Sequence, residues 1–212
     1  MRAFVLALAL PLAAAQFFGS KSTEPEVTFD EGYEYVTAGS TIQLSHVKSD
    51  TRLTLPQVTY GTGSQQQAIT TQTDKASSHN FWRVQVAGAE RGEPVQCGSD
   101  VRLVNSDSKF LLHSHDGHKS PISSNQEVSG YDGKDEGDVW VVECVKEKLW
   151  RREAPVVFKH KETGKFLQSL PSKKYRQPIV GHQEVSAGKK ADSNAQWKAL
   201  EGYYFNRVVV QK

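Results

Sequence analysis

Three histidines lie close together in the middle of the chain. His113 and His115 flank Ser114, and His118 follows nearby. Because alternate residues of a β-strand point to the same face, the imidazoles of His113 and His115 are expected on one face, a spacing that a metal ion could use. No cysteine or carboxylate cluster in the sequence supplies a further ligand. Hydrogen bonding that fixes the loops is the favoured role, a ligand or partner contact is the alternative, and no metal or other cofactor is predicted.

Two other segments resemble known sites without completing them. Residues 132–143, DGKDEGDVWVVE, have the Asp, Gly and Glu of an EF-hand loop at positions one, six and twelve, but position three is Lys134 and no helix flanks the loop. Gly61-Thr62-Gly63 lacks the strand-to-helix context of a phosphate loop. No G-x-S-x-G or H-E-x-x-H motif occurs and no nucleophile is paired with a base, so the protein is predicted not to be an enzyme.

Polar residues of a repeated motif form a second group of candidates. Asn125 and Gln126 begin the sequence NQEVSG, and Gln126 recurs as Gln67 and Gln183. An amide at a turn suits bonds to backbone groups, and that structural role is favoured over ligand binding. Asn125 and Gln126 are nevertheless kept with His113, Ser114 and His115 as candidate binding residues.

Charge is unevenly distributed along the chain, although the formal net charge is only +2. Residues 93–149 carry six Lys or Arg against eleven Asp or Glu, a net charge of −5, whereas residues 150–200 carry eleven against four, a net charge of +7. Such asymmetry controls the rate and orientation of protein association more than its affinity. Lys173, Lys174 and Arg176 are therefore the candidate docking cluster, and the mild overall charge argues against nucleic-acid binding.

These candidates belong to a sequence unit that occurs three times. Apolar residues alternate in short pairs, the period of half-buried strands, and six positions keep their register twice, with shifts of 58–59 residues and then 55–57 residues. The six positions are Ile42, Leu44, Leu53, Gln67, Ile69 and Trp82, then Val101, Leu103, Leu112, Gln126, Val128 and Trp140, then Val156, Phe158, Leu167, Gln183, Val185 and Trp197. The repeats are assigned to residues 35–88, 93–149 and 150–201.

Each repeat contains four strand-like pieces and is too small to bury its own apolar face. Three such units must share one core, which predicts an all-β protein, a β-trefoil of about twelve strands without substantial helix. Trp82, Trp140 and Trp197 should then be equivalent core residues. Repeat two has one extra residue, assigned to the segment KFLL, so a bulge is expected in that hairpin.

The ends of the chain predict its compartment. Residues 1–15 combine a positive charge, a short apolar run and Ala13-Ala14-Ala15, as in a cleavable signal peptide, and the run is too short to span a bilayer. Residues 16–34 read as a flexible segment and 202–212 as a tail. In an oxidising compartment the two cysteines, Cys97 and Cys144, are expected to form a disulfide across repeat two.

Three segments resemble MIR repeats, the module shared by protein O-mannosyltransferases and the inositol trisphosphate and ryanodine receptors. They are GSTIQLSH, CGSDVRLVN and APVVFKHKETGKFL, each followed by a Gln-centred motif and then by Trp. From about Tyr35 to Gly202 the chain resembles the stromal cell-derived factor 2 family, through YGTGSQQQAIT, LHSHDGHKSPISSNQEVSG and KKYRQPIVGHQEVSAG among other segments.

The resemblance implies a non-enzymatic protein of the endoplasmic reticulum lumen that acts in protein quality control. Its implied partners are a luminal J-domain co-chaperone, a BiP-type chaperone and unfolded client proteins. The alternative is a lectin-like module that binds O-mannosyl or other glycans. The sequence ends in VVVQK instead of the retrieval tetrapeptide of many animal relatives, so retention in the lumen would depend on a partner, with secretion as the alternative.

Overall fold

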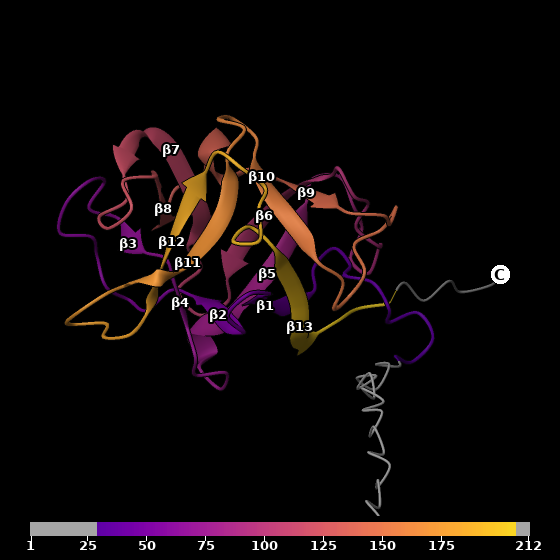
Figure 1. Cartoon of the computed structure of the whole chain (residues 1–212). Helices are drawn as coiled ribbons and strands as arrows, with labels where there is room; N and C mark the ends of the chain where they lie inside the picture. The colour runs from indigo at the N-terminus through magenta and orange to yellow at the C-terminus, as the bar shows by residue number, and fades with distance from the viewer. Residues whose placement is uncertain (1–28, 207–212) are drawn as a thin grey trace, which may run out of the picture.

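The repeated unit is visible in each third of the chain (Figure 1). The computed structural model describes residues 29–206, so the predicted signal peptide, part of the adjoining segment and the end of the tail lie outside the described residues. Repeat one contains β1 (Thr41–His46), β2 (Thr51–Thr54), β3 (Gln67–Ala68), β4 (Thr70–Gln72) and β5 (Phe81–Val86). Repeat two contains β6 (Asp100–Asn105), β7 (Leu111–Lys119), β8 (Gln126–Tyr131) and β9 (Trp140–Cys144), and repeat three contains β10 (Val156–His160), β11 (Phe166–Lys174), β12 (Gln183–Gly188) and β13 (Trp197–Tyr203).

The described residues thus form thirteen strands where twelve were predicted, because the third strand of repeat one is interrupted at Ile69 and counts as β3 and β4. Helical structure in the described part is confined to two short 3-10 helices, η1 (Ser78–Asn80) and η2 (Glu136–Asp138), each just before the last strand of its repeat. The prediction of an all-β fold without substantial helix is confirmed.

The first and last strands of the repeats close into a barrel. The antiparallel pairs β1–β5, β5–β6, β6–β9, β9–β10, β10–β13 and β13–β1 form a ring of six strands without a free edge. Ring closure solves the problem that each repeat has on its own, since an isolated four-strand unit would expose unpaired edges.

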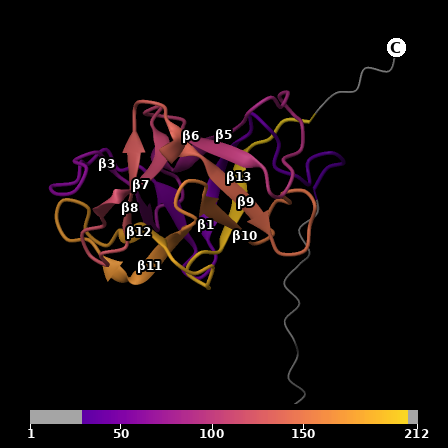
Figure 2. The ribbon, with the colours of Figure 1, turned by 90° about the horizontal axis from the view of Figure 1, so that it is seen from above.

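The inner strands form three hairpins that cover one end of the barrel. The strand pairs β2–β4, β7–β8 and β11–β12 are joined to one another by the contacts β12–β4, β12–β8 and β3–β8. In Figure 1 this cap lies on the left and the barrel on the right, and Figure 2 shows the same division from above. A six-stranded barrel with a triangular hairpin cap is the β-trefoil predicted from the repeats.

The three repeated tryptophans are equivalent in the core. Trp82, Trp140 and Trp197 are fully buried, and each indole Nε1 donates to a backbone carbonyl of its own repeat. The acceptors are Leu53 at 3.0 Å, Leu112 at 2.9 Å and Leu167 at 2.9 Å, respectively. These leucines are themselves equivalent positions of the repeats. The tryptophans therefore serve packing and strand placement, because a platform for stacking a sugar would need an exposed ring.

The expected bulge within KFLL is absent. Asp50, Lys109 and Gly164 occupy the same turn position in the three repeats, each with a positive φ and an amide bonded to the carbonyl four residues earlier. The first hairpins therefore have equal length. Repeat three is longer than repeat two by two residues in the next hairpin, between β11 and β12, and both β7–β8 and β11–β12 change register along their length.

The predicted disulfide is present. Cys97 and Cys144 are bonded with their Cα atoms 5.6 Å apart, and they join the segment before β6 to the end of β9. Within residues 29–206, no helix has the length and apolar character needed to cross a membrane.

Candidate functional site

Three polar side chains at equivalent positions hold the turns of the barrel strands. They are His46, Asn105 and His160, separated by the same 59 and 55 residues as the apolar repeat positions. The Nε2–H of His46 donates to the Asn194 carbonyl at 3.0 Å, and its Nδ1 accepts from the Ser49 hydroxyl at 2.7 Å. His160 contacts Gly137 and Thr163 in the same way, and Asn105 contacts His79 and Ser108. These residues were not among the predicted site residues, although their common spacing marks them in the sequence.

Burial of these histidines favours the neutral imidazole. The pKa of His46 is lowered from 6.5 to about 4, chiefly by desolvation and to a smaller extent by Lys48, while the bond to the Asn194 carbonyl acts in the opposite direction. Desolvation likewise lowers the pKa of His160. Both rings pack against core tryptophans, His46 on Trp197 and His160 on Trp140. These two histidines are structural elements of the fold.

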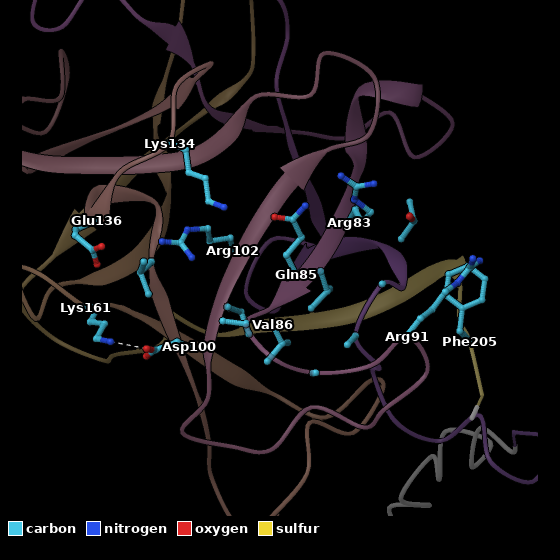
Figure 3. A pocket seen from close by; sticks show the side chains of 18 residues that line it. Arg83, Gln85, Val86, Arg91, Asp100, Arg102, Lys134, Glu136, Lys161 and Phe205 are labelled. Carbon is cyan, nitrogen blue, oxygen red and sulfur yellow. Dashed lines mark hydrogen bonds and ion pairs between the residues drawn. The ribbon is translucent and has the colours of Figure 1, made fainter. Parts of the chain in front are cut away.

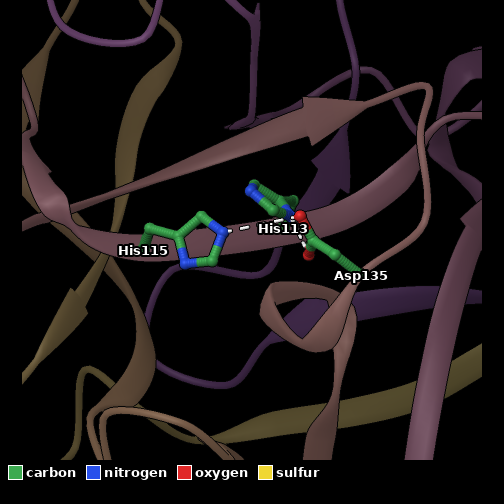
Figure 4. A group of neighbouring side chains, drawn as sticks. All are labelled: His113, His115 and Asp135. Carbon is green, nitrogen blue, oxygen red and sulfur yellow. Dashed lines mark ion pairs between the residues drawn. The ribbon is translucent and has the colours of Figure 1, made fainter.

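His113 and His115 on β7 face a pair of carboxylates from η2. His113 is buried, and its Nδ1 lies 2.9 Å from Oδ1 of Asp138 and 3.5 Å from Oδ1 of Asp135. Half-exposed His115 directs Nε2 at Asp135, 3.6 Å away, and Nδ1 at Glu162, 2.9 Å away. The two rings meet edge to face with centroids 4.6 Å apart, as expected for alternate residues on one strand face (Figure 4).

The carboxylates come from the segment that resembled an EF-hand loop. Asp135 is the N-cap of η2: its side chain accepts from the Gly137 amide, while Asp138 accepts from the Asp135 amide at 2.8 Å. The short helix thereby fixes both carboxylates beside β7. The segment is a 3-10 helix with its N-cap, and the expectation that no carboxylate cluster accompanies the histidines is wrong.

Ser114 and the residues of the NQEVSG motif are engaged inside the protein. The Ser114 hydroxyl donates to the Glu127 carbonyl, and the Gln126 amide donates to Ser114 at 2.8 Å and to Thr163 at 3.1 Å. The Asn125 amide donates to Ser186 of repeat three at 3.1 Å. The bonds to Thr163 and Ser186 tie repeat two to repeat three, and binding roles for Ser114, Asn125 and Gln126 stay predictions.

The glutamates of the same motif tie repeat two to repeat one and repeat three to repeat two. Glu184 is fully buried, and its carboxylate accepts from the backbone amides of Ile122 at 2.7 Å and Ser123 at 3.0 Å. Glu127 does the same for the loop of repeat one, where it accepts from the amide and hydroxyl of Ser64. A carboxylate that receives several backbone N–H bonds is a strong interaction in a buried setting.

The basic cluster Lys173, Lys174 and Arg176 lies on the β11–β12 hairpin, away from the histidines in sequence. All three side chains are exposed, whereas Tyr175 between them is directed inward. Burial raises the pKa of Tyr175 above its usual range. The hairpin thus anchors one aromatic ring and presents its cations to solvent.

A cleft of about 730 Å³ lies over β5 and β6, where repeats one and two meet. Its outward residues alternate with the core residues of these strands, and Gln85 stands opposite Arg102 in the register. Five cations line the cleft against two carboxylates (Figure 3): Arg83, Arg91, Arg102, Lys134 and Lys161 against Asp100 and Glu136. The excess positive charge makes the cleft suited to anionic or hydroxyl-rich ligands.

Two of the cleft's cations already have partners. Lys161 forms an ion pair with Asp100, and the Arg91 guanidinium lies 3.6 Å from the centroid of the Phe205 ring. The Arg102 Nε is buried and makes no hydrogen bond within the described residues. The cleft could not be predicted from the sequence, because its walls combine residues of all three repeats with the C-terminal segment.

Trefoil architecture, three equivalent indole anchors and three equivalent turn residues define a protein built from MIR repeats. The MIR domain family model matches residues 34–138. Human stromal cell-derived factor 2 is 38% identical over 175 residues, which cover 80% of this chain and 82% of that protein. The chain belongs to the stromal cell-derived factor 2 family.

Similar solved structures include a relative of the same family and part of a larger enzyme. The SDF2-like protein of Arabidopsis thaliana superposes with a TM-score of 0.78 at 34% identity, covering 81% of this chain and 98% of that chain. The Saccharomyces cerevisiae protein O-mannosyltransferase Pmt1-Pmt2 complex, solved bound to its sugar donor, matches with a TM-score of 0.73 at 25% identity, covering 81% of this chain and 26% of that chain. The same module therefore occurs within a much larger enzyme.

Proposed function

We propose that the protein is a non-enzymatic subunit of a protein-folding and quality-control complex in the endoplasmic reticulum lumen. In this complex it binds a J-domain co-chaperone, and through it a BiP-type chaperone that acts on unfolded client proteins. Membership of the stromal cell-derived factor 2 family, with 82% of the human relative matched, is the observation that carries the proposal. The predicted signal peptide supports the compartment.

The arrangement of charge supports a role in binding. The repeated polar residues are occupied by internal bonds, as for Ser114 and Gln126, while Lys173, Lys174 and Arg176 remain exposed on one hairpin. Exposed charges on a rigid hairpin steer a partner of opposite charge and fix its orientation. We therefore propose that the partner's docking face is acidic. The same contact is proposed to retain this protein in the lumen.

Affinity purification from luminal extracts of the native cell, followed by mass spectrometry, tests the proposal. The wild-type protein should recover a J-domain co-chaperone and a BiP-type chaperone, and Lys173→Glu/Lys174→Glu should recover less of both. Lys189→Glu/Lys190→Glu is the matched control, because it reverses two exposed lysines of the same repeat outside the proposed docking cluster. Recovery of neither chaperone by the wild type would refute the proposal.

Glycan binding is the second candidate function, and two observations favour it. The related yeast enzyme complex that contains the module was solved bound to its sugar donor, and the cleft offers several hydrogen-bond donors beside exposed strand surface. A glycan array separates the candidates. Saturable binding that is lost in Arg102→Ala would support a lectin-like role, whereas an array without signal together with co-purified chaperones would support the complex subunit alone.

A further inference from the structure

We propose that His113, His115 and Asp135 form a binding site for one divalent transition cation of the zinc class. The site lies between β7 and η2 in repeat two (Figure 4). This proposal is independent of the proposed function, because binding of a metal ion to this chain requires no partner protein. The sequence favoured a structural role for His113 and His115 because no carboxylate cluster was found near them. The fold brings such carboxylates to the two histidines.

The distances fit a shared metal ion. One ligand atom from each residue lies within 4.8 Å of the others. The Nδ1 of His113 is 3.5 Å from Oδ1 of Asp135, and the Nε2 of His115 is 3.6 Å from Oδ2 of the same carboxylate. Ligands at about 2.0–2.1 Å from a tetrahedral zinc ion are about 3.4 Å from each other. Each imidazole is thus already near the ligand spacing from one oxygen of Asp135, and three protein ligands would leave a coordination position for water.

The charge of the cluster also fits a cation. Besides Asp135, the carboxylate of Asp138 contacts His113 and that of Glu162 contacts His115. Within residues 29–206, none of these three carboxylates forms an ion pair with a lysine or arginine. Three carboxylates therefore meet beside the two imidazoles, and Asp138 is completely buried. A dication would offset most of this charge, which is costly at a buried position.

Neighbouring groups orient the ligands as they do in metal sites. Glu162 accepts from Nδ1–H of His115, so the lone pair on Nε2 faces Asp135. At His113, Nδ1 lies between Asp135 and Asp138, so it faces the space in which an ion held by Asp135 would sit.

Repeat one provides an internal comparison. Thr54 and Asn80 stand at the positions of His113 and Asp138, and the amide of Gln72 bridges them by donating to Thr54 at 3.1 Å and to Asn80 at 2.9 Å. Neutral groups are therefore sufficient to fasten the second strand of a repeat to its 3-10 helix. The histidines and carboxylates of repeat two add charge and ligand atoms that this fastening does not require.

Equilibrium dialysis of the untagged mature protein against zinc chloride tests the proposal. The wild type should bind one zinc ion per chain, and His115→Gln and Asp135→Asn should each weaken binding at least about tenfold. His118→Gln is the matched control, because His118 is an exposed histidine of the same strand outside the cluster, and it should bind as the wild type does. Near-ultraviolet circular dichroism checks that each variant is folded.

A second measurement needs no variant. Zinc added to the wild type should shift the imidazole NMR signals of His113 and His115 and leave those of His79, His118 and His182 in place. Absence of saturable binding by the wild type would overturn the proposal. Equal affinity in the wild type, His115→Gln and Asp135→Asn, or zinc-dependent shifts at the other histidines alone, would overturn it as well.

Discussion

Replacement of the buried His46 by asparagine is expected to reduce the protein's sensitivity to acid. Asparagine is the residue that repeat two uses at this position, where Asn105 bonds the His79 carbonyl and the amide of Ser108. The His46→Asn variant should therefore keep the turn while removing a titratable group. Some stability at neutral pH is lost with the ring that packs on Trp197.

The size of the effect follows from the pKa of His46, which burial lowers from 6.5 to about 4. The unfolded chain binds the proton more tightly than the native protein does, so stability is full above pH 6.5 and falls as the pH decreases toward 4. With these two pKa values the loss is about 2 kcal/mol at pH 5 and about 3 kcal/mol below pH 4. Burial of the ring in the core justifies this use of the pKa shift, because solvent screening is small there.

Urea unfolding at pH 7.5 and pH 5 measures the difference. Between these pH values the wild type should lose about 2 kcal/mol more of its free energy of unfolding than His46→Asn does. His118→Asn, at an exposed histidine, controls for the loss of one histidine as such. Equal pH dependence in the wild type and His46→Asn would show that the buried ring is not held neutral by the fold, and would refute the reasoning.

Three further stability predictions follow from contacts in the core and between repeats. Trp140→Phe removes the donor to the Leu112 carbonyl and part of the indole volume, and should cost about 2–3 kcal/mol in chemical unfolding. Replacing both Cys97 and Cys144 by serine removes the disulfide, which closes a loop of 47 residues, and should lower the free energy of unfolding by about 4 kcal/mol. An unchanged urea midpoint would contradict the stabilising role of the disulfide. Glu184→Ala leaves two part-buried backbone amides without their acceptor and should cost about 1–3 kcal/mol, with a smaller loss in Glu184→Gln, which keeps one carbonyl oxygen.

The fold could be predicted because each of its determinants is repeated. Apolar alternation and the spacing of Trp82, Trp140 and Trp197 determine the strands and the shared core, and a single arrangement of three such units closes without free edges. The predictions that are wrong concern residues between the repeated positions. The bulge expected within KFLL is absent, since alignment of apolar residues does not show which hairpin carries an additional residue.

The candidate site was only partly predictable. Alternation on a strand placed His113 and His115 together, but Glu162 lies 47 residues after His115 and reaches it only because strands of different repeats pair in the barrel. The cationic cleft depends in the same way on the register of β5 with β6. Such contacts arise from tertiary pairing, which residue spacing within one repeat does not encode.

The proposal that this protein works by docking to a luminal co-chaperone is tested most directly with purified partners on a biosensor. The J-domain co-chaperone should bind the immobilised mature protein, and the association rate should fall about fourfold to tenfold as salt is raised from 0.05 to 0.5 M. The rate falls because salt shortens the Debye length and screens the electrostatic steering between the two proteins. Lys173→Glu/Lys174→Glu should reduce the rate further at low salt, whereas Lys189→Glu/Lys190→Glu should retain the wild-type rate. Absence of binding by the wild type at micromolar concentration would contradict the account.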